Sequence, residues 1–447
     1  MRALGLGGKI GYGIGDFGLN LYWQSILVFI VFFHVDVLGL SAWTAGVCFF
    51  IAGLWDAAMD PLMGALSDKT RSRWGQYRPF ILLGAVPLAG AFTLCFSPPS
   101  WLVPGSAAMV AFALASHMLL RTTYSVVGIP YSSLTAAMTS DTEARASLTG
   151  WRMLFAFMGC TAVTALLPLL AAWFGQDGGN GYGPAAAIIG TMSVVALLIC
   201  GLSVREQARP AVVLPAAAER GGNGFWAAIG RNGPLLRLMA ATLVMQLGLG
   251  VLLRNLPYLM KYDLGDAALS GTALPWLTLL GVASVPVWVT VAKRWNKRIL
   301  WQWGSAVAAL GALGLMLERG LWPTLICIGL VFIGHTAHGV ATWSMLPDTV
   351  DYGQWRSGRR DEAKIYGIAS CVLKLSLGAS GIVAGWALDL VGFVPNAEQA
   401  PQTLEQFRLL AGLLPAAGLA ASAALIWRYP LDAQSHRQIL GRLAAGA

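Results

Sequence analysis

Apolar runs of about 20 residues or more recur along the whole chain, and no other feature limits its possible folds as strongly. Each run is long enough to cross the roughly 30 Å of hydrocarbon in a bilayer as an α-helix. Charged residues make up 11% of the chain, whereas a soluble domain has about 25%. A transmembrane β-barrel needs short segments of alternating polarity instead, and the sequence contains none. We therefore predict an all-α membrane protein that crosses the bilayer many times.

The runs predict twelve transmembrane helices, at about residues 10–34, 41–66, 80–98, 106–136, 146–173, 185–203, 233–260, 269–292, 299–317, 320–347, 365–391 and 407–428. The longest connection is rich in Ala, Gly and Arg and divides the helices into two sets of six. We therefore expect an N-terminal six-helix bundle at 1–203, a cytoplasmic linker at 204–232, a C-terminal six-helix bundle at 233–428 and a cytoplasmic tail at 429–447. Two pseudo-symmetric halves around a midplane site are typical of alternating-access transporters.

The loop charges predict the orientation of the chain in the membrane. Most Lys and Arg residues of the loops follow the even-numbered helices, and such basic loops stay in the cytoplasm. Both termini are therefore expected in the cytoplasm, with the protein in a bacterial inner membrane. We interpret the net charge of +9 as this topology signal and not as a nucleic-acid surface.

Two carboxylates interrupt the second predicted helix. Asp56 and Asp60 are four residues apart, about one helical turn, so they share one face of the helix. A charged side chain at the bilayer centre costs about 2.5–3.5 kcal/mol or more. Two such charges repel each other unless a cation or a proton lies between them. We predict a coupling-ion site here; the alternative is a structural pair bonded to a neighbouring Arg or Lys.

Several short motifs occur in order along nearly the whole chain: YGIGDFG at 12–18, WDAAMDP at 55–61, TRSRWGQYRP at 70–79, GIPYSSL at 128–134, DTEARASLTGWR at 141–152, DTVDYGQW at 348–355 and GFVPNAEQ at 392–399. With these motifs and Lys374, the chain resembles the glycoside–pentoside–hexuronide:cation symporters, the melibiose permease-like family of the major facilitator superfamily. The resemblance implies a twelve-helix fold and secondary active transport of a sugar with Na⁺, Li⁺ or H⁺.

The resemblance also implies site residues, position by position. For cation coupling they are Asp56, Asp60, Ser125 and Lys374. For the substrate they are Asn20, Tyr124, Gly128, Arg152 and Lys374, with Asn20 and Gly128 in place of two sugar-binding aspartates.

The residue types add three further substrate candidates, which are Trp23, Arg121 and Trp343. An aromatic ring such as Trp23 can stack on the apolar face of a sugar. An Arg inside a membrane helix must face a cavity or a carboxylate, so Arg121 either lines the site or pairs with Asp16 or Asp56. Lipid-interface positions are the alternative for the aromatic residues of the first helix.

One difference from the family's pattern predicts the coupling ion, and the charges in the predicted helices predict the charge of the substrate. Met59 stands where a sodium-using member has an asparagine, and a thioether is a poor ligand for a hard cation. We therefore predict that the ion is a proton. Away from their ends, the predicted helices also hold more cations than carboxylates: Arg121, Arg152, Arg254 and Lys374 against Asp16, Asp56 and Asp60. This excess suits an acidic glycoside, with a neutral sugar as the alternative.

A cytoplasmic gate is predicted at two basic loops. The loop after the second helix has Asp68 and Arg71, and the end of the tenth helix has Asp348, Asp351 and Arg356. Salt bridges among such residues can close one side of a carrier when it opens on the other. Orientation by loop charge alone is the alternative.

The sequence shows no motif for a catalytic nucleophile, a phosphate loop or a metal, so we predict a transporter with no enzyme activity and no resident cofactor. Its expected partners are a sugar or glycoside, a monovalent cation and the lipid bilayer, and we expect a monomer. A lipid or lysolipid carrier of the same fold and a non-transporting membrane sensor are the alternative functions.

Overall fold

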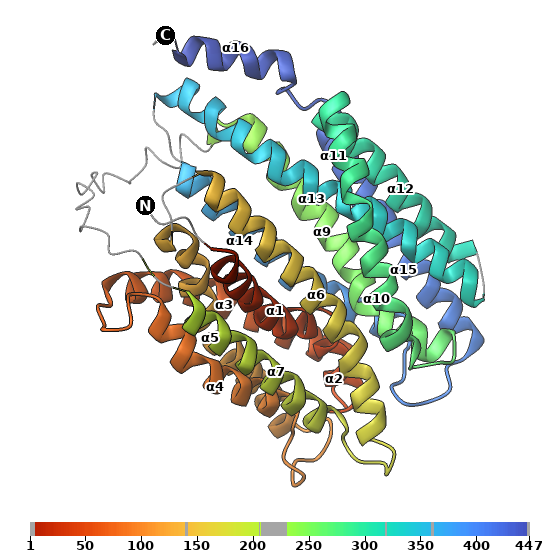
Figure 1. The fold of residues 1–447 in the computed structure, drawn as a ribbon. Coiled ribbons are helices and arrows are strands. Elements are labelled where there is room, and N and C mark those ends of the chain that lie inside the picture. The colour runs from red at the N-terminus through yellow and green to blue at the C-terminus, as the bar shows by residue number, and fades with distance from the viewer. Residues whose placement is uncertain are drawn as a thin grey trace. The chain divides into compact units, whose positions relative to one another are not determined.

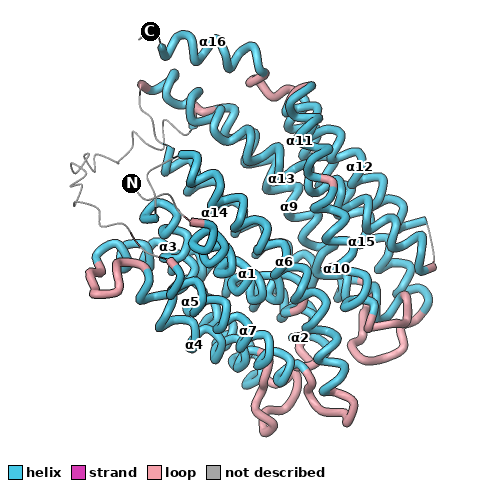
Figure 2. The backbone as a smooth tube through the Cα atoms, viewed as in Figure 1, coloured by secondary structure: helices cyan, strands magenta, loops and turns pink. Residues whose placement is uncertain are grey.

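The computed structural model describes residues 5–138, 142–204, 206, 230–317, 320–358 and 362–444, and almost all of them are helical (Figure 1 and Figure 2). Eleven of the described helices are long and apolar enough to cross a membrane. Helices α1 (Leu6–Val28) and α2 (Ile30–Asp36) meet at a bend of 48° and together make a twelfth candidate span. The predicted all-α, many-span architecture is therefore confirmed.

The first of two compact units comprises residues 1–210, 253–279 and 381–404. Its full helices are α1, α2, α3 (Ala42–Lys69), α4 (Arg78–Cys95), α5 (Ala107–Met138), α6 (Thr142–Phe174) and α7 (Tyr182–Ser203). Shorter parts come from α9 (Gly233–Tyr258), the π-helix η1 (Leu259–Asp263), α10 (Leu269–Ala283) and α14 (Glu362–Leu390). Helix α1 packs against α6 and α7, and α3 packs against α5.

Glycines let α3 approach the end of α14 closely within this unit. A Cβ added to Gly385 would lie 2.1 Å from the carbonyl oxygen of Ala42, and one added to Gly46 would lie 2.4 Å from that of Gly381. Membrane helices associate largely through such close packing of small residues. A larger residue at either glycine would push the two helices apart.

The second unit comprises residues 211–252, 280–380 and 405–447. Its described helices are most of α9, α11 (Val285–Arg294), α12 (Lys297–Leu317), α13 (Leu321–Ser357), most of α14, most of α15 (Pro401–Trp427) and α16 (Ala433–Ala444). Helix α12 packs along α13, where a Cβ at Gly334 would lie 2.4 Å from the carbonyl oxygen of Gly304.

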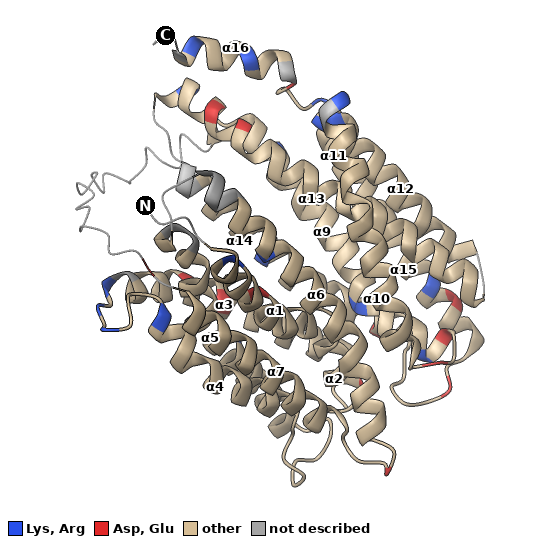
Figure 3. Cartoon of the chain, in the orientation of Figure 1, with Lys and Arg blue, Asp and Glu red and all other residues tan. Residues whose placement is uncertain are grey.

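Two elements differ from the predicted spans. Helix α13 continues past residue 347 to Ser357 although Pro347 lies inside it, and its last turns carry polar residues. The expected tail contains α16, which is too short and too polar to have been predicted as a span. Figure 3 shows Lys and Arg in the loop between α3 and α4 and on α16, outside the apolar spans. The expected linker at 204–232 lies almost wholly outside the described residues, so the division into two six-helix halves stays a prediction.

Candidate functional site

The two acids of α3 are joined by one hydroxyl group of α5. The Oγ atom of Ser125 lies 3.1 Å from Oδ1 of Asp56 and 2.7 Å from Oδ1 of Asp60. A serine hydroxyl carries a single proton and can donate only one full hydrogen bond. The second contact is therefore stabilised when a carboxyl group carries a proton or when a cation lies among the three oxygens. The predicted cation-coupling residues of the first unit thus come together.

Arg121 approaches this pair from one side. Its Nη1 atom lies 3.6 Å from Oδ2 of Asp56, and both side chains are 3% exposed. This is the pairing with Asp56 that was one alternative for Arg121, and it gives Asp56 a fixed positive neighbour. Asp60 is half-buried, whereas Asp56 is buried, so the two acids have different surroundings.

His117 holds the guanidinium of Arg121 from the other side. Nε of Arg121 donates to Nε2 of His117 at 3.3 Å. Because that nitrogen accepts a hydrogen bond, the proton of the neutral imidazole lies on Nδ1. Nδ1 is buried without a hydrogen-bond partner among the described residues, and the ring of His34 lies 6.0 Å away, centroid to centroid. His117 is not among the site residues predicted from the sequence.

An aromatic wall lies beside Arg121. The rings of Trp23 and Tyr124 are 5.6 Å apart, and the guanidinium of Arg121 lies 5.1 Å from the Trp23 ring. The three atoms nearest to a Cβ built on Gly128 all belong to Tyr124, at 3.4–3.9 Å, so a side chain at Gly128 would meet ordinary contact distances. The structure therefore places the substrate candidates Trp23, Arg121 and Tyr124 together, with Gly128 one turn further along α5.

Two other substrate candidates lie around a second ion pair. Arg152 of α6 pairs with Asp16 of α1 through Nε at 2.5 Å and through Nη2 at 3.4 Å. The stacked rings of Tyr12 and Tyr131 cover this pair, and the guanidinium lies 5.1 Å from the Tyr131 ring. Asn20 donates from Nδ2 to the carbonyl of Asp16 at 2.8 Å. Arg152 and Asn20 thus already have protein partners, and their contact with substrate stays a prediction.

The remaining substrate candidates lie in the second unit. Trp343 of α13 is 52% exposed, and its ring is stacked on Tyr366 with centroids 6.4 Å apart. Lys374 lies half-buried on α14. Their roles in binding the substrate and in coupling also stay predictions.

The predicted gate residues have partners that the sequence did not indicate. Nζ of Lys297 lies 2.7 Å from Asp348, and Nε2 of His436 on α16 lies 3.0 Å from Asp351. Arg356 is exposed, with its guanidinium over the Trp355 ring. Arg71 donates to the carbonyl of Thr70 at 3.1 Å. The side chain of Asp68 lies outside the described residues.

A further polar network in the first unit was missed by the sequence reasoning. Asp36 at the end of α2 pairs with Lys261 and accepts from the hydroxyl of Tyr262 at 2.6 Å. Asn396 donates from Nδ2 to the carbonyl of Asp36 at 2.6 Å and accepts from Lys261 at 2.8 Å. Of these residues, the sequence analysis included only Asn396, as part of the motif GFVPNAEQ.

Metal binding gains no support from the geometry. Across the described ranges, no three or more His, Cys, Asp or Glu side chains come together in a way that could hold a metal ion. The oxygens of Asp56, Asp60 and Ser125 come close together, and the binding of a cation or a proton there stays a prediction.

The chain matches the family described as MFS/sugar transport protein over residues 11–433. It is 31% identical to a putative sulfoquinovose importer of Salmonella typhimurium strain LT2, over 99% of this chain and 93% of the relative. It is 28% identical to a putative glycoside/cation symporter of Escherichia coli strain K12, over 100% and 97%. The inward-open xylose transporter of E. coli has a similar fold, with a TM-score of 0.63, 13% identity and coverage of 95% and 96%.

These relatives are named as transporters, not as enzymes, and they match the chain along nearly its whole length. The resemblance that the short motifs carried is therefore confirmed. This chain belongs to the MFS/sugar transport protein family and is a multi-pass sugar or glycoside symporter of the major facilitator superfamily.

Proposed function

We propose that this symporter couples the uptake of an acidic glycoside to a proton by alternating access, with both termini in the cytoplasm. The observation that carries the proposal is the Ser125 hydroxyl, which lies within hydrogen-bonding distance of both Asp56 and Asp60. Binding of the proton and of the solute together favours the closed carrier, so the coupling is a free-energy linkage between adjacent sites.

A proton fits the acid pair better than Na⁺ does. One proton on either carboxyl group turns the two Ser125 contacts into two complete hydrogen bonds and removes the repulsion between the acids. Sodium needs several oxygen ligands, and Met59, on the turn between the acids, offers only a thioether. The salt bridge of Arg121 to Asp56 favours Asp60 as the carboxyl group that loads and releases the proton.

The charge balance around the acids supports an acidic solute. Arg121 and Arg254 lie over the same Phe49 ring, at 5.6 and 4.3 Å, and Arg254 is 1% exposed. Loading a proton on the acid pair removes one negative charge from the neighbourhood of these guanidinium groups. An acidic glycoside would bring a negative charge back, and buried charges are stable when they are paired.

The aromatic wall supports a sugar as the body of the solute. Trp23 and Tyr124 present half-buried rings next to Arg121, and sugars combine apolar ring faces with hydroxyl groups that need partners. The relative that is named as a sulfoquinovose importer suggests a sulfonated sugar as one candidate beside hexuronides. A neutral sugar is the competing substrate class.

The test is uptake by the purified protein in proteoliposomes with imposed gradients. A proton gradient without Na⁺ should drive accumulation of a labelled hexuronide, and a Na⁺ gradient at equal pH should not. Strict dependence on Na⁺ would overturn the proposal that the coupling ion is a proton. Preference for the matched neutral hexoside would overturn the proposal that the solute is acidic. Each result leaves the family assignment unaffected.

A further inference from the structure

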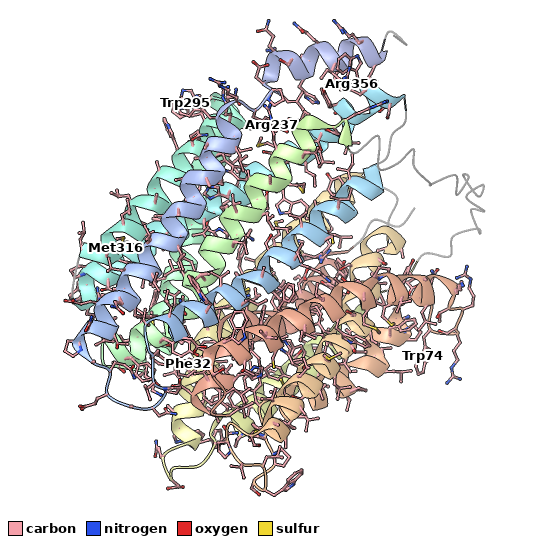
Figure 4. The ribbon with its side chains drawn as sticks, turned by 180° about the vertical axis from the view of Figure 1, so that it is seen from behind. Phe32, Trp74, Arg237, Trp295, Met316 and Arg356 are labelled. Atoms are coloured by element: carbon pink, nitrogen blue, oxygen red, sulfur yellow. The ribbon has the colours of Figure 1, made fainter. Side chains whose placement is uncertain are left out.

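The second unit has an open pocket at the end of α15 that is separate from the residues described above. The pocket is lined by Arg237 of α9, Gln302 of α12, the α15 residues Ala423, Ala424, Leu425 and Trp427, and Arg428 directly after α15. Figure 4 labels Arg237 at the end of this unit that carries α16. Helix α15 has 27 residues and is therefore about 40 Å long, which places its last turn at the level of the lipid headgroups.

Two arginines line this pocket, Arg237 and Arg428, and Arg298 of α12 bonds to the same end of α15. Arg237 donates from Nη1 to the carbonyl of Arg428 at 2.5 Å, and Arg298 donates from Nη1 to the carbonyl of Trp427 at 3.4 Å. Each bond uses one of the five N–H donors of a guanidinium group, and it also neutralises the negative end of α15. Asp432 interacts with Arg298 and accepts a hydrogen bond from the backbone N–H of Ser435 at 2.7 Å.

The rim of the pocket is apolar and outward-facing. Trp427 is 67% exposed, and Leu425 is also exposed. Tryptophan is enriched at membrane interfaces, where its ring lies among the headgroups. A small soluble anion would leave this apolar rim exposed, whereas the acyl chains of a lipid would cover it.

We propose that this pocket binds an anionic phospholipid, with the phosphate on Arg237, Arg428 and Arg298 and the acyl chains along Leu425 and Trp427. Charge complementarity supports this occupant, because basic pockets between helices on the cytoplasmic side hold anionic headgroups. The orientation proposed from the loop charges puts this end of the unit at the cytoplasm, and the lipid proposal rests on that orientation. The proposal is independent of the transported solute and of the coupling ion.

Native mass spectrometry of the full chain tests the proposal with phosphatidylglycerol and phosphatidylcholine added separately. We expect the wild-type protein to retain phosphatidylglycerol at least about tenfold more tightly, and the Arg237→Gln/Arg428→Gln variant to lose about tenfold, the scale for two arginines at an anionic surface. Arg294→Gln removes an equally exposed arginine outside the pocket and should stay within about twofold.

Two further arms keep the test decisive. The Arg237→Lys/Arg428→Lys variant keeps the charge and should retain most of the binding, and it replaces the Gln variant if that one fails to fold. Inorganic phosphate should not displace the lipid, because it cannot cover the apolar rim. Equal retention of both lipids, unchanged binding by the Gln variant, or displacement by phosphate would each overturn the proposal.

Discussion

Two buried carboxylate sites of the first unit differ in how completely their charge is paired. Asp16 faces one guanidinium, which reaches both of its oxygens at 2.5 and 3.4 Å. Asp56 has a looser partner in Arg121 at 3.6 Å and shares the Ser125 hydroxyl with Asp60. A closely paired carboxylate has little to gain from a proton, whereas two acids that share one donor gain a hydrogen bond and lose repulsion. If the pair on α3 carries the coupling proton, as proposed, Asp16 is expected to be structural.

The largest expected effect follows from neutralising Asp60, one member of the acid pair. Asp60→Asn should reduce proton-driven accumulation about hundredfold, to background, because the loading group is gone. Counterflow of labelled solute in the absence of a gradient should persist, because the aromatic wall remains. Equal accumulation by Asp60→Asn and wild type would remove the distinction between the two sites.

The shared hydroxyl is the next most sensitive point. Ser125→Ala should lower proton-driven uptake about tenfold, since the proton loses one hydrogen-bond partner in a buried site. Ser125→Thr keeps the hydroxyl and serves as the matched control, with uptake near the wild-type level. If both variants behaved alike, the hydroxyl would have no part in coupling. Initial rates across a pH series measure the effect.

His117 should have a smaller influence because it acts through Arg121. His117→Leu removes the acceptor for Nε of Arg121 and frees the guanidinium to change its position against Asp56. We expect about a threefold change in the apparent proton affinity of uptake, in line with one lost hydrogen bond. His117→Gln keeps an acceptor and should restore the wild-type pH profile. A profile unchanged in His117→Leu would show that Asp56 does not depend on this contact.

Substitutions in the Asp16–Arg152 pair should have the smallest effect on proton coupling. The single variants Asp16→Asn and Arg152→Gln each leave the remaining charged residue without its partner and should lower the Tm by about 5 °C. The double variant Asp16→Asn/Arg152→Gln removes both charges and should recover most of that stability, with the apparent proton affinity of uptake within about threefold of wild type whether or not Arg152 contacts the substrate. Loss of coupling in a stable double variant would show that this pair also takes part in ion transfer.

The sequence predicted the spans and the acid pair because both depend on local pattern. Long apolar runs identify membrane helices, and a spacing of four residues puts Asp56 and Asp60 on one helix face. It could not predict the partners, because the Arg152–Asp16 and Lys261–Asp36 pairs join residues 136 and 225 positions apart. Helix α16 was missed for another reason: short amphipathic helices do not resemble spans, and its contact to Asp351 depends on tertiary packing.

The proton count on substrate binding tests the central claim most directly. A weakly buffered solution of the purified protein with a pH-sensitive dye reports how many protons the protein takes up when a saturating hexuronide is added. We predict uptake of about one proton per molecule in the wild type and none in Asp60→Asn, with both proteins folded and binding the hexuronide. Binding without proton uptake in the wild type, or equal uptake in both proteins, would contradict a proton held between Asp56, Ser125 and Asp60.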